Sequence, residues 1–336
     1  MDFPQSKILI IKPSALGDIV HSLPFLYSLR QRYPEAEIHW VVARGLHGLI
    51  EDHPMIQRLW IIDKERWKEL SKLPQTFAQL RRLQGELRRE RFDLVVDLQG
   101  LLRSGLIAWA TGAPCRIGFR EAREGSPFFY THRVRGGREI HAAERYMKVA
   151  TFLGCESSPL VFPLPPFPPH PPLVESLPAK YAVLAPSAGT EVKRWPPDRF
   201  GELASRLPLP SVVVGAGSDF ALAERVAAAS RGKAISLAGK TSMKELFAVI
   251  HNAKFVVSND TGPMHIAAAL QVPVFAIFGP TNPYRTGPYG QIHTIIREDI
   301  PCSPCYRRKT CGNVRCMDNL SVERVLDIIH AKEADL

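Results

Sequence analysis

One short stretch near the C-terminus places a carboxylate, a hydroxyl and an imidazole close together, from Asp260, Thr261 and His265. An apolar run at 255–257 precedes them and another at 266–270 follows, which predicts a buried strand, a polar turn and a helix. The first backbone N–H groups of a helix have no acceptor within it, and its dipole is positive at that end. We therefore expect a phosphate or pyrophosphate at this turn.

A second carboxylate, Asp18, follows a predicted strand at 7–13 and lies in the first turn of a predicted helix at 16–33. Gly17 permits a tight turn against a ligand. A carboxylate at the carboxyl end of a strand, in a partly closed cleft that raises its pKa, can accept a proton near neutral pH. We expect Asp18 to be a general base, and the alternative is an ordinary helix cap.

A third group of polar residues lies between a predicted strand at 181–185 and a predicted helix at 198–207. Ser187 and Gly189 are small enough for backbone N–H groups to approach an anion, and Lys193 would neutralise its charge. This pattern favours a phosphate cradle. The alternative is a basic loop that leads into a helix at the prolines.

Alternating strand and helix periods surround these residues and predict parallel sheets covered on both faces. The further strands expected in the first half lie at 38–43, 59–62 and 94–97, with a basic amphipathic helix at 78–91. The second half repeats the pattern, with further strands at 211–214, 234–238 and 274–278 and helices at 220–230, 243–253 and 321–332. We expect Ser321 to cap the last helix.

Proline divides the chain, because eight of the fourteen residues from 159 to 172 are Pro. This density excludes a packed helix or strand and predicts a stiff, extended linker. We expect an N-terminal domain at 1–158, a linker at 159–178 and a C-terminal domain at 179–336. Ligands of such sheets bind at the carboxyl ends of strands, so the cleft between the two domains is the expected site.

The composition is that of a globular protein, with 336 residues, 45% apolar and 23% charged. No apolar stretch approaches the ~20 residues of a membrane span, and the first residues lack the pattern of a signal peptide. We expect a cytoplasmic protein. Its net charge is +10, and the segment 81–138 holds twelve Arg and no Lys.

This charge pattern has two interpretations. It can be a solvated basic surface, or it can attract an anionic partner. Arg holds carboxylate and phosphate groups in a bidentate fork, which Lys cannot do. Nucleic acid is one anionic partner for such a charge, but the sequence holds no recognisable nucleic-acid-binding module. An anionic small molecule or a phospholipid-like surface fits at least as well.

Six cysteines are present. Cys115 and Cys155 are isolated, which predicts buried thiols. Four others cluster with spacing C-x2-C-x5-C-x4-C, at Cys302, Cys305, Cys311 and Cys316. This spacing is tighter than that of a paired zinc ribbon, so we expect free thiols, with a bound metal as the alternative.

Residues 212–220 suggest a nicotinamide-dependent oxidoreductase as a competing function. Gly215 and Gly217 follow a predicted strand, as in a dinucleotide-binding turn. Phe220 stands where the third glycine is required, and the strand is not the first of its domain. A dinucleotide site is therefore disfavoured. A third possibility is a binding protein without catalytic activity.

Four blocks in this order resemble the bacterial ADP-heptose:lipopolysaccharide heptosyltransferase family. They are SALGDIVH at 14–21, KRWP at 193–196, DTGPMH at 260–265 and FGPT at 278–281. The resemblance extends from about residue 7 to 329. It implies the GT-B architecture, two Rossmann-like domains with parallel sheets that face each other across a cleft.

The resemblance also implies an inverting single displacement from ADP-L-glycero-β-D-manno-heptose, bound by the C-terminal domain. Asp18 would be the base, and Lys193 with the helix N-terminus would stabilise the departing ADP. Asp219 matches a ribose contact, and Asp260 a donor-sugar contact or helix cap. The implied donor-site residues are Ser187, Gly189, Lys193, Asp219, Asp260, Thr261, Gly262 and His265. For His265 the alternative is a histidine satisfied within its helix. No metal or cofactor is required.

The N-terminal domain would bind the acceptor, Kdo-lipid A, since segments 97–104, 122–125, 129–130 and 141–145 resemble enzymes that add the first heptose. The four-cysteine segment is more typical of enzymes that add the second. Arg103, Arg120 and Arg123 are the candidate acceptor contacts, unless they are simply solvated. A helix with Arg81, Arg82, Arg88 and Arg89 would rest on the anionic inner face of the inner membrane.

Overall fold

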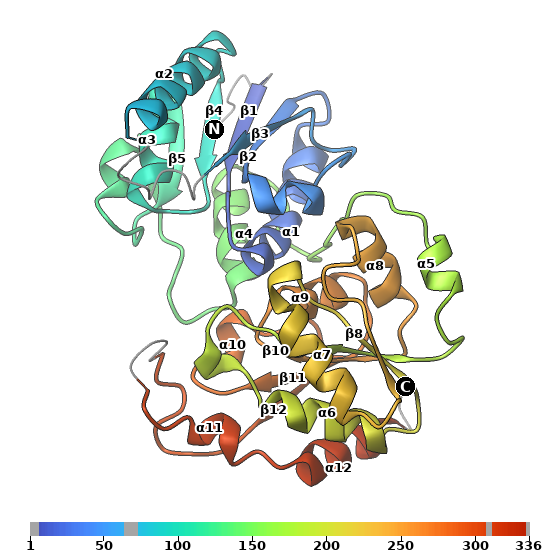
Figure 1. Ribbon diagram of the computed structural model, residues 1–336. Helices are drawn as coiled ribbons and strands as arrows, with labels where there is room; N and C mark the ends of the chain where they lie inside the picture. The colour runs from blue at the N-terminus through green and yellow to red at the C-terminus, as the bar shows by residue number, and fades with distance from the viewer. Residues whose placement is uncertain (1–6, 64–72, 307–310, 334–336) are drawn as a thin grey trace. The chain divides into compact units, whose positions relative to one another are not determined.

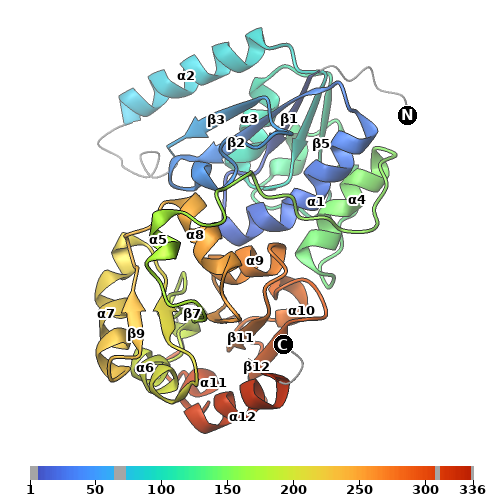
Figure 2. The same ribbon diagram turned by 90° about the vertical axis from the view of Figure 1, so that its right-hand side faces the viewer.

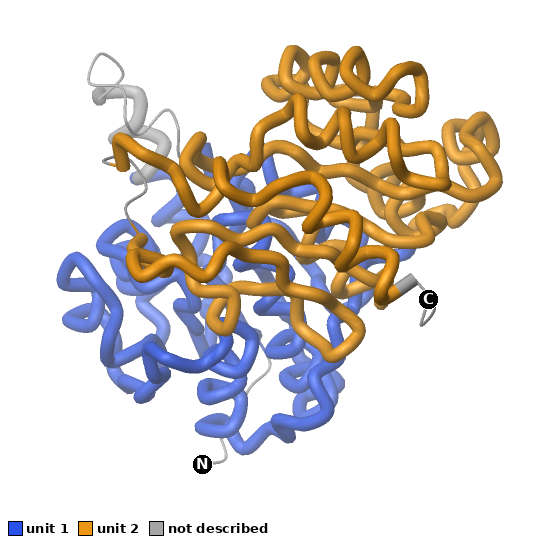
Figure 3. Tube along the Cα trace, turned by 90° about the horizontal axis from the view of Figure 1, so that it is seen from below, with its two compact units in different colours: residues 1–166 blue, residues 167–336 orange. Residues whose placement is uncertain are grey.

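The computed structural model describes residues 7–63, 73–306 and 311–333 of the chain (Figure 1). The chain divides into two compact units, Met1–Pro166 and Phe167–Leu336 (Figure 3). Their boundary falls in the Pro-rich segment. Because Pro donates no backbone hydrogen bond, residues 159–171 form no helix or strand, and α5 (Pro172–Glu175) then begins at a proline.

The first unit is built on a six-stranded, wholly parallel sheet with the order β3-β2-β1-β4-β5-β6. Its central strands are continuous apolar runs because both faces of the sheet are covered. The strands are β1 (Lys7–Ile11), β2 (Glu37–Ala43), β3 (Arg58–Ile62), β4 (Leu94–Asp97), β5 (Cys115–Phe119) and β6 (His132–Val134).

Two pairs of helices cover this sheet (Figures 1 and 2). α2 (Leu73–Arg89) and α3 (Leu102–Ala110) pack on one face, where Leu87 and Ile107 join a core with β1 and β4. α1 (Leu16–Arg32) and α4 (Ala142–Phe152) pack against each other on the opposite face. Two short 3-10 helices, η1 (Arg44–Leu49) and η4 (Ser126–Phe129), complete the unit.

The second unit is also built on six parallel strands, in the order β12-β11-β10-β7-β8-β9. They are β7 (Ala182–Ala185), β8 (Ser211–Val213), β9 (Ala234–Ser236), β10 (Val256–Asn259), β11 (Val274–Phe278) and β12 (Thr294–Arg297). Read from β9, the order repeats that of the first unit strand for strand.

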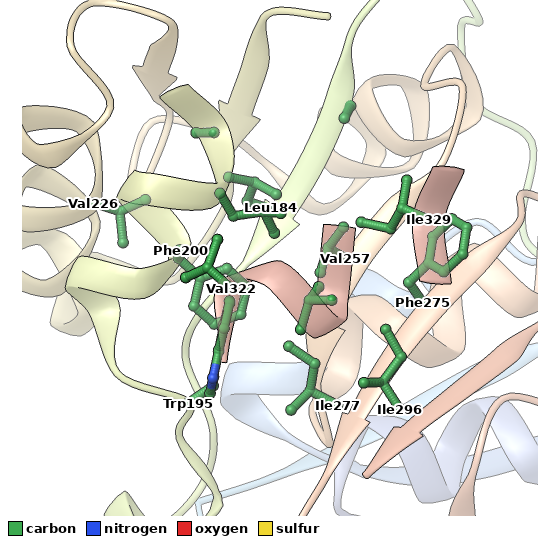
Figure 4. Packing of buried hydrophobic residues seen from close by; sticks show 14 of the residues in the cluster. Leu184, Trp195, Phe200, Val226, Val257, Phe275, Ile277, Ile296, Val322 and Ile329 are labelled. Atoms are coloured by element: carbon green, nitrogen blue, oxygen red, sulfur yellow. The ribbon is translucent and has the colours of Figure 1, made fainter. Parts of the chain in front are cut away.

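On one face of this sheet lie α6 (Pro197–Arg206), α7 (Phe220–Ala229) and α12 (Val322–Glu333). Figure 4 shows their core, in which Trp195 and Phe200 pack near Leu184 and Val257. The other helices are α8 (Met243–His251), α9 (Gly262–Ala269), α10 (Pro283–Thr286) and α11 (Arg315–Asp318), with 3-10 turns η5 (Glu191–Lys193) and η6 (Gly217–Asp219). Ser321 Oγ accepts the backbone N–H of Arg324, so the expected cap of α12 is confirmed.

The strand order creates one topological switch point in each unit, between β1 and β4 and between β7 and β10. At such a point the connections leave toward opposite sides, which opens a crevice at the carboxyl ends of the two strands. The fold therefore offers one ligand site per unit before any side chain is considered. The expected fold class, two Rossmann-like α/β units of GT-B type, is confirmed.

Candidate functional site

In the second unit, one carboxylate oxygen of Asp260 accepts two hydrogen bonds at the switch point. Lys193 Nζ lies 2.5 Å from Asp260 Oδ2, and Thr281 Oγ1 donates to the same oxygen at 2.8 Å. The side chains of Lys193 and Asp260 are only 15% and 9% exposed, so water screens this pair weakly. Asp260 is held by these side chains and is not the cap of the helix that follows.

The KRWP block explains how Lys193 reaches this position. Trp195 is fully buried, and its ring N–H donates to Leu320 O at 2.8 Å. Arg194 folds back and donates to Ala188 O, which closes the loop before it. Lys193 therefore points to Asp260 from a backbone held on both sides.

Asn259 is a buried residue that connects the two strands of the switch point. Its Nδ2 donates to Pro186 O at 2.7 Å, and its Oδ1 accepts the backbone N–H of Trp195 at 3.1 Å. It thereby ties the end of β10 to the loops after β7. Neither Asn259 nor Thr281 was expected to have a role from the sequence, although Thr281 lies in the block at 278–281 and Asn259 directly precedes the block at 260–265.

The helix α9 begins at this same place. Thr261 is its N-cap residue in extended conformation, and its side chain accepts no N–H of the helix. Gly262 and Pro263 open the first turn, and His265, the fourth residue of the helix, is buried. The amides of the first turn have no acceptor within the helix, so they present partial positive charge beside the Lys193–Asp260 pair.

Three other expected donor-site residues lie on neighbouring loops. Ser187 is buried just after β7, and Gly189 is exposed with open space where a side chain would be. Asp219 follows β8, and its Oδ2 accepts the backbone N–H of Ala216 at 3.0 Å. The carboxyl ends of adjacent parallel strands thus place all the expected donor-site residues of this unit along one edge of its sheet.

In the first unit, Asp18 lies in the first turn of α1. Its Oδ2 accepts the backbone N–H of Ala15 at 3.1 Å and lies 3.6 Å from Lys12 Nζ. Both contacts use Oδ2, so Oδ1 has no protein partner within the described ranges. The side chain of Asp18 is 40% exposed. Gly17 lies inside α1, so the expectation that it permits a tight turn against a ligand was wrong.

Lys12 is a buried cation for which no role was expected from the sequence. Its Nζ donates to Leu98 O at 3.4 Å and lies 5.3 Å from the centre of the Tyr146 ring. Burial by itself lowers the pKa of Lys12, but the charge of Asp18 and the contact with Tyr146 outweigh it, so the pKa lies above its usual value. Lys12 therefore stays charged and holds a carboxylate beside it.

Asp97 closes the neighbouring strand β4 and is fully buried. It accepts a 2.6 Å hydrogen bond from the Tyr130 hydroxyl and two from the backbone N–H groups of Gln99 and Gly100. Burial raises the pKa of Asp97, and these hydrogen bonds offset part of the rise. Gly118 is required here, because a Cβ would lie 2.2 Å from the Tyr130 ring.

The matches to known proteins agree with this geometry. The glycosyltransferase family 9 (heptosyltransferase) pattern covers residues 80–313. The chain belongs to this family. It is a glycosyltransferase, as the four sequence blocks predicted.

Members and structures of the heptosyltransferase family show how far the similarity extends. Lipopolysaccharide heptosyltransferase 1 of Pseudomonas aeruginosa is 31% identical over 91% of this chain and 87% of its own length. Lipopolysaccharide heptosyltransferase 2 of Salmonella typhimurium is 27% identical over 97% and 98%. The solved structure of E. coli heptosyltransferase WaaC with ADP is similar over 97% of this chain and 99% of its own, with a TM-score of 0.78 and 25% identity.

Family membership disfavours the nicotinamide alternative, and the structure supplies a reason. Gly215 and Gly217 follow β8, which is the second strand of its unit, and Phe220 opens α7 where close packing would require glycine.

Within the described ranges, no helix combines the length and hydropathy needed to cross a bilayer.

The candidate acceptor contacts Arg103, Arg120 and Arg123 are all exposed in the first unit. The Arg123 backbone N–H donates to Gly100 O at 2.9 Å, which attaches its loop to the start of α3. Arg103 and Arg123 therefore lie near the carboxyl end of β4, next to the strand that leads to Asp18.

All six cysteines are free thiols. Cys115 and Cys155 are buried as expected, and burial raises the pKa of Cys155 to about 11. In the four-cysteine segment, burial and the neighbouring thiols raise the pKa of Cys316 to about 11. Among the described residues, no three or more His, Cys, Asp or Glu side chains are arranged to hold a metal.

The same segment is attached to the loop that carries Thr281. Ser303 Oγ donates to Gly279 O at 2.7 Å, and the backbone N–H groups of Cys305 and Tyr306 donate to Pro280 O. The segment therefore supports the loop from which Thr281 contacts Asp260.

Proposed function

We propose that the protein transfers L-glycero-D-manno-heptose from ADP-heptose to the Kdo residue of the lipopolysaccharide inner core. The proposal that the protein binds ADP-heptose as donor rests on the Lys193–Asp260 pair beside the first turn of α9. A cation and a helix N-terminus together suit a pyrophosphate. The relative whose solved structure contains ADP has the same two-unit fold.

The donor would lie along the carboxyl edge of the second sheet. Lys193 and the α9 amides would contact the pyrophosphate, and Asp219 the ribose hydroxyls. Because two donors occupy Asp260 Oδ2, its Oδ1 is available to accept a heptose hydroxyl. Ser187 and Gly189 leave room for the diphosphate to approach the backbone.

Asp18 would act as the general base of an inverting displacement. Its Oδ1 takes the proton of the acceptor hydroxyl while that oxygen attacks the anomeric carbon of the heptose. The bond from the anomeric carbon to the β-phosphate oxygen breaks, and ADP departs with the bonding electrons. Lys193 and the α9 amides stabilise the charge that develops on the β-phosphate, so the step requires no metal ion.

Lys12 would position Asp18 for this step. It is an uncommon residue in a protein interior, and its ammonium holds Oδ2 while Oδ1 stays open. Arg103, Arg120 and Arg123 would bind the carboxylates and phosphates of the acceptor bidentately.

The acceptor we propose is Kdo-lipid A without heptose, which places the protein at the cytoplasmic face of the inner membrane. The segments 97–104, 122–125, 129–130 and 141–145, which resemble enzymes that add the first heptose, support this choice. The alternative is addition of the second heptose, which the four-cysteine segment favours.

One assay tests the proposal. ADP-heptose is offered with Kdo-lipid A and, separately, with an acceptor that already carries one heptose. We expect turnover with the first and little with the second. The reverse preference would establish the alternative, and no transfer to either would refute the function.

A further inference from the structure

The helix α3 exposes an apolar face to solvent. Leu102, Leu106 and Trp109 are 41%, 43% and 52% exposed, and their spacing places them on one side of the helix. The opposite side is buried, since Ile107 and Ala108 pack into the core beneath the sheet. The exposed face is therefore not a consequence of poor packing.

A fourth apolar side chain extends this face. The 3-10 helix η4 packs closely on α3 at Gly105, where a Cβ would lie only 2.9 Å from the Phe129 ring. This contact brings Phe128, which is 84% exposed, alongside α3. We call Leu102, Leu106, Trp109 and Phe128 the α3 stripe.

Arginine surrounds the α3 stripe. Arg103 is exposed beside it on α3, and the loop that carries Arg123 is attached to Gly100 just before α3. At the other end, the side chain of Arg88 from α2 approaches Gly112. Glu124 is an acidic neighbour, and its Oε2 accepts the backbone N–H of Leu102.

The surrounding segment is basic throughout. Residues 81–138 hold twelve Arg against six Asp and Glu. Of these acids, Asp97 is buried and Glu86 and Glu90 are paired with basic side chains. The net charge of the segment that carries the α3 stripe is therefore positive.

We propose that the α3 stripe is a docking surface for a bilayer that contains anionic phospholipid. Trp and Phe at an interface bury their rings at headgroup depth, while arginines beside them bind phosphates. A second copy of this chain fits less well, because it would bring the same arginines against one another. A bilayer supplies both the apolar layer and the negative charge.

The docking surface rests on the proposed function because it assumes a lipid-anchored acceptor. It extends that function by naming the surface through which the protein would reach the bilayer. α3 begins just after the carboxyl end of β4, at the edge of the sheet where Lys12 and Asp18 lie. Docking through the α3 stripe would bring that edge close to a lipid-anchored acceptor. Membrane contact was expected from the sequence only for the helix with Arg81, Arg82, Arg88 and Arg89, and the proposed surface adds an apolar part on α3.

Vesicle flotation tests the docking surface. The full chain is mixed with phosphatidylcholine vesicles or with vesicles that also contain about 30 mol% phosphatidylglycerol. We expect binding to the anionic vesicles, weakened by high salt, and at least about tenfold weaker partitioning of a Trp109→Ser/Phe128→Ser variant. A matched control, Phe220→Ser/Tyr284→Ser, removes two exposed rings from the second unit and should bind as the parent does.

Each outcome has a defined meaning. Equal flotation of the Trp109/Phe128 variant and the parent would overturn the proposal, as would equal binding to neutral and anionic vesicles. A concentration-dependent dimer in sedimentation velocity that the variant abolishes, without flotation, would assign the stripe to a second copy. Unchanged thermal unfolding and ADP affinity of the variant show that it is folded.

A water-soluble Kdo acceptor separates this proposal from the proposed function. We expect the variant to keep parental turnover with the soluble acceptor and to lose at least about fivefold with Kdo-lipid A in anionic vesicles. If the parent floats but transfers heptose to neither acceptor, the function fails and the docking surface stands. If the variant equals the parent on vesicles, the docking surface fails and the function stands.

Discussion

Lys12 Nζ lies 3.6 Å from Asp18 Oδ2, and the two side chains are 3% and 40% exposed. The cation is thus fixed inside the unit while the carboxylate stays accessible at its surface. An ion pair of this kind orients the acid from behind and leaves its outer oxygen open to substrate.

Replacing Lys12 by Met should separate positioning from stability. Met fills similar apolar space, and Asp18 stays hydrated without its partner, so we expect little loss of thermal stability. We expect kcat to fall about tenfold with KM for both substrates unchanged, because Asp18 loses its orientation. A variant with Lys12→Arg should recover part of kcat. A parental kcat for the Met variant would show that Lys12 has only a structural role.

Asp18→Asn should remove the base and retain the helix cap, since the amide oxygen can still accept the Ala15 N–H. We expect transfer to fall by at least about 100-fold, with ADP affinity nearly unchanged because the proposed nucleotide site is in the second unit. Steady-state kinetics and calorimetric titration with ADP measure the two effects. Asp18→Ala, which also removes the cap, is the companion variant, and normal turnover in Asp18→Asn would exclude the general-base role.

Lys193→Ala should weaken ADP binding and slow transfer together. Loss of a charge-assisted contact to phosphate predicts a rise in Kd for ADP of about tenfold or more. Lys254→Ala, which truncates an exposed lysine of the same unit, is the control. Parental ADP affinity in Lys193→Ala would refute contact with the pyrophosphate.

Thr281→Val should affect the sugar more than the nucleotide. The substitution keeps the shape and removes the hydrogen bond to Asp260 Oδ2, which is worth on the order of 1 kcal/mol. We expect kcat/KM for ADP-heptose to fall about fivefold while Kd for ADP changes by less than about twofold. A larger effect on ADP than on ADP-heptose would mean that Asp260 serves the phosphates instead.

The pH dependence of stability should include a contribution from His293. Burial lowers the pKa of His293 to about 4, from an ordinary value of 6.5. Between these values the unfolded chain binds a proton that the folded chain does not, so stability falls as the pH falls from 6.5 toward 4. From pH 7.5 to 4.5 this amounts to about 2–3 kcal/mol.

Urea unfolding of the parent and of His293→Gln at these two pH values measures that difference. The variant should lose less stability on acidification than the parent. His39 and His53, whose pKa values burial also lowers, keep part of the dependence in both proteins. An identical acid loss in the two proteins would contradict the prediction.

Local patterns predicted much of the fold. Continuous apolar runs located the central strands, and the predicted helices begin and end within a few residues of those observed. β5, β6, α3, α4 and β12 were not predicted. β6 and β12 have only three and four residues, and the sequence of β5 is interrupted by Arg116 and Gly118, so none shows a long apolar run.

Only some residues of the candidate site could be predicted from the sequence. The polar turn at Asp260 and the basic loop at Lys193 stood out because their residue types suit an anion in any fold. Lys12 did not, because a lysine after a strand is common and nothing local shows that it is buried. Asn259 and Thr281 were missed for the same reason, since amide and hydroxyl groups acquire a role only through their partners.

The sequence by itself determined the period of each element, the start of α9 at Gly262 and Pro263, and the charge of each loop, since these depend on neighbouring residues. The tertiary structure decided which loops meet. Lys193 and Asp260 are 67 positions apart, and Thr281 and Asp260 are 21 apart. They meet because strand order, which no local pattern encodes, puts β7, β10 and β11 side by side with their carboxyl ends at one edge.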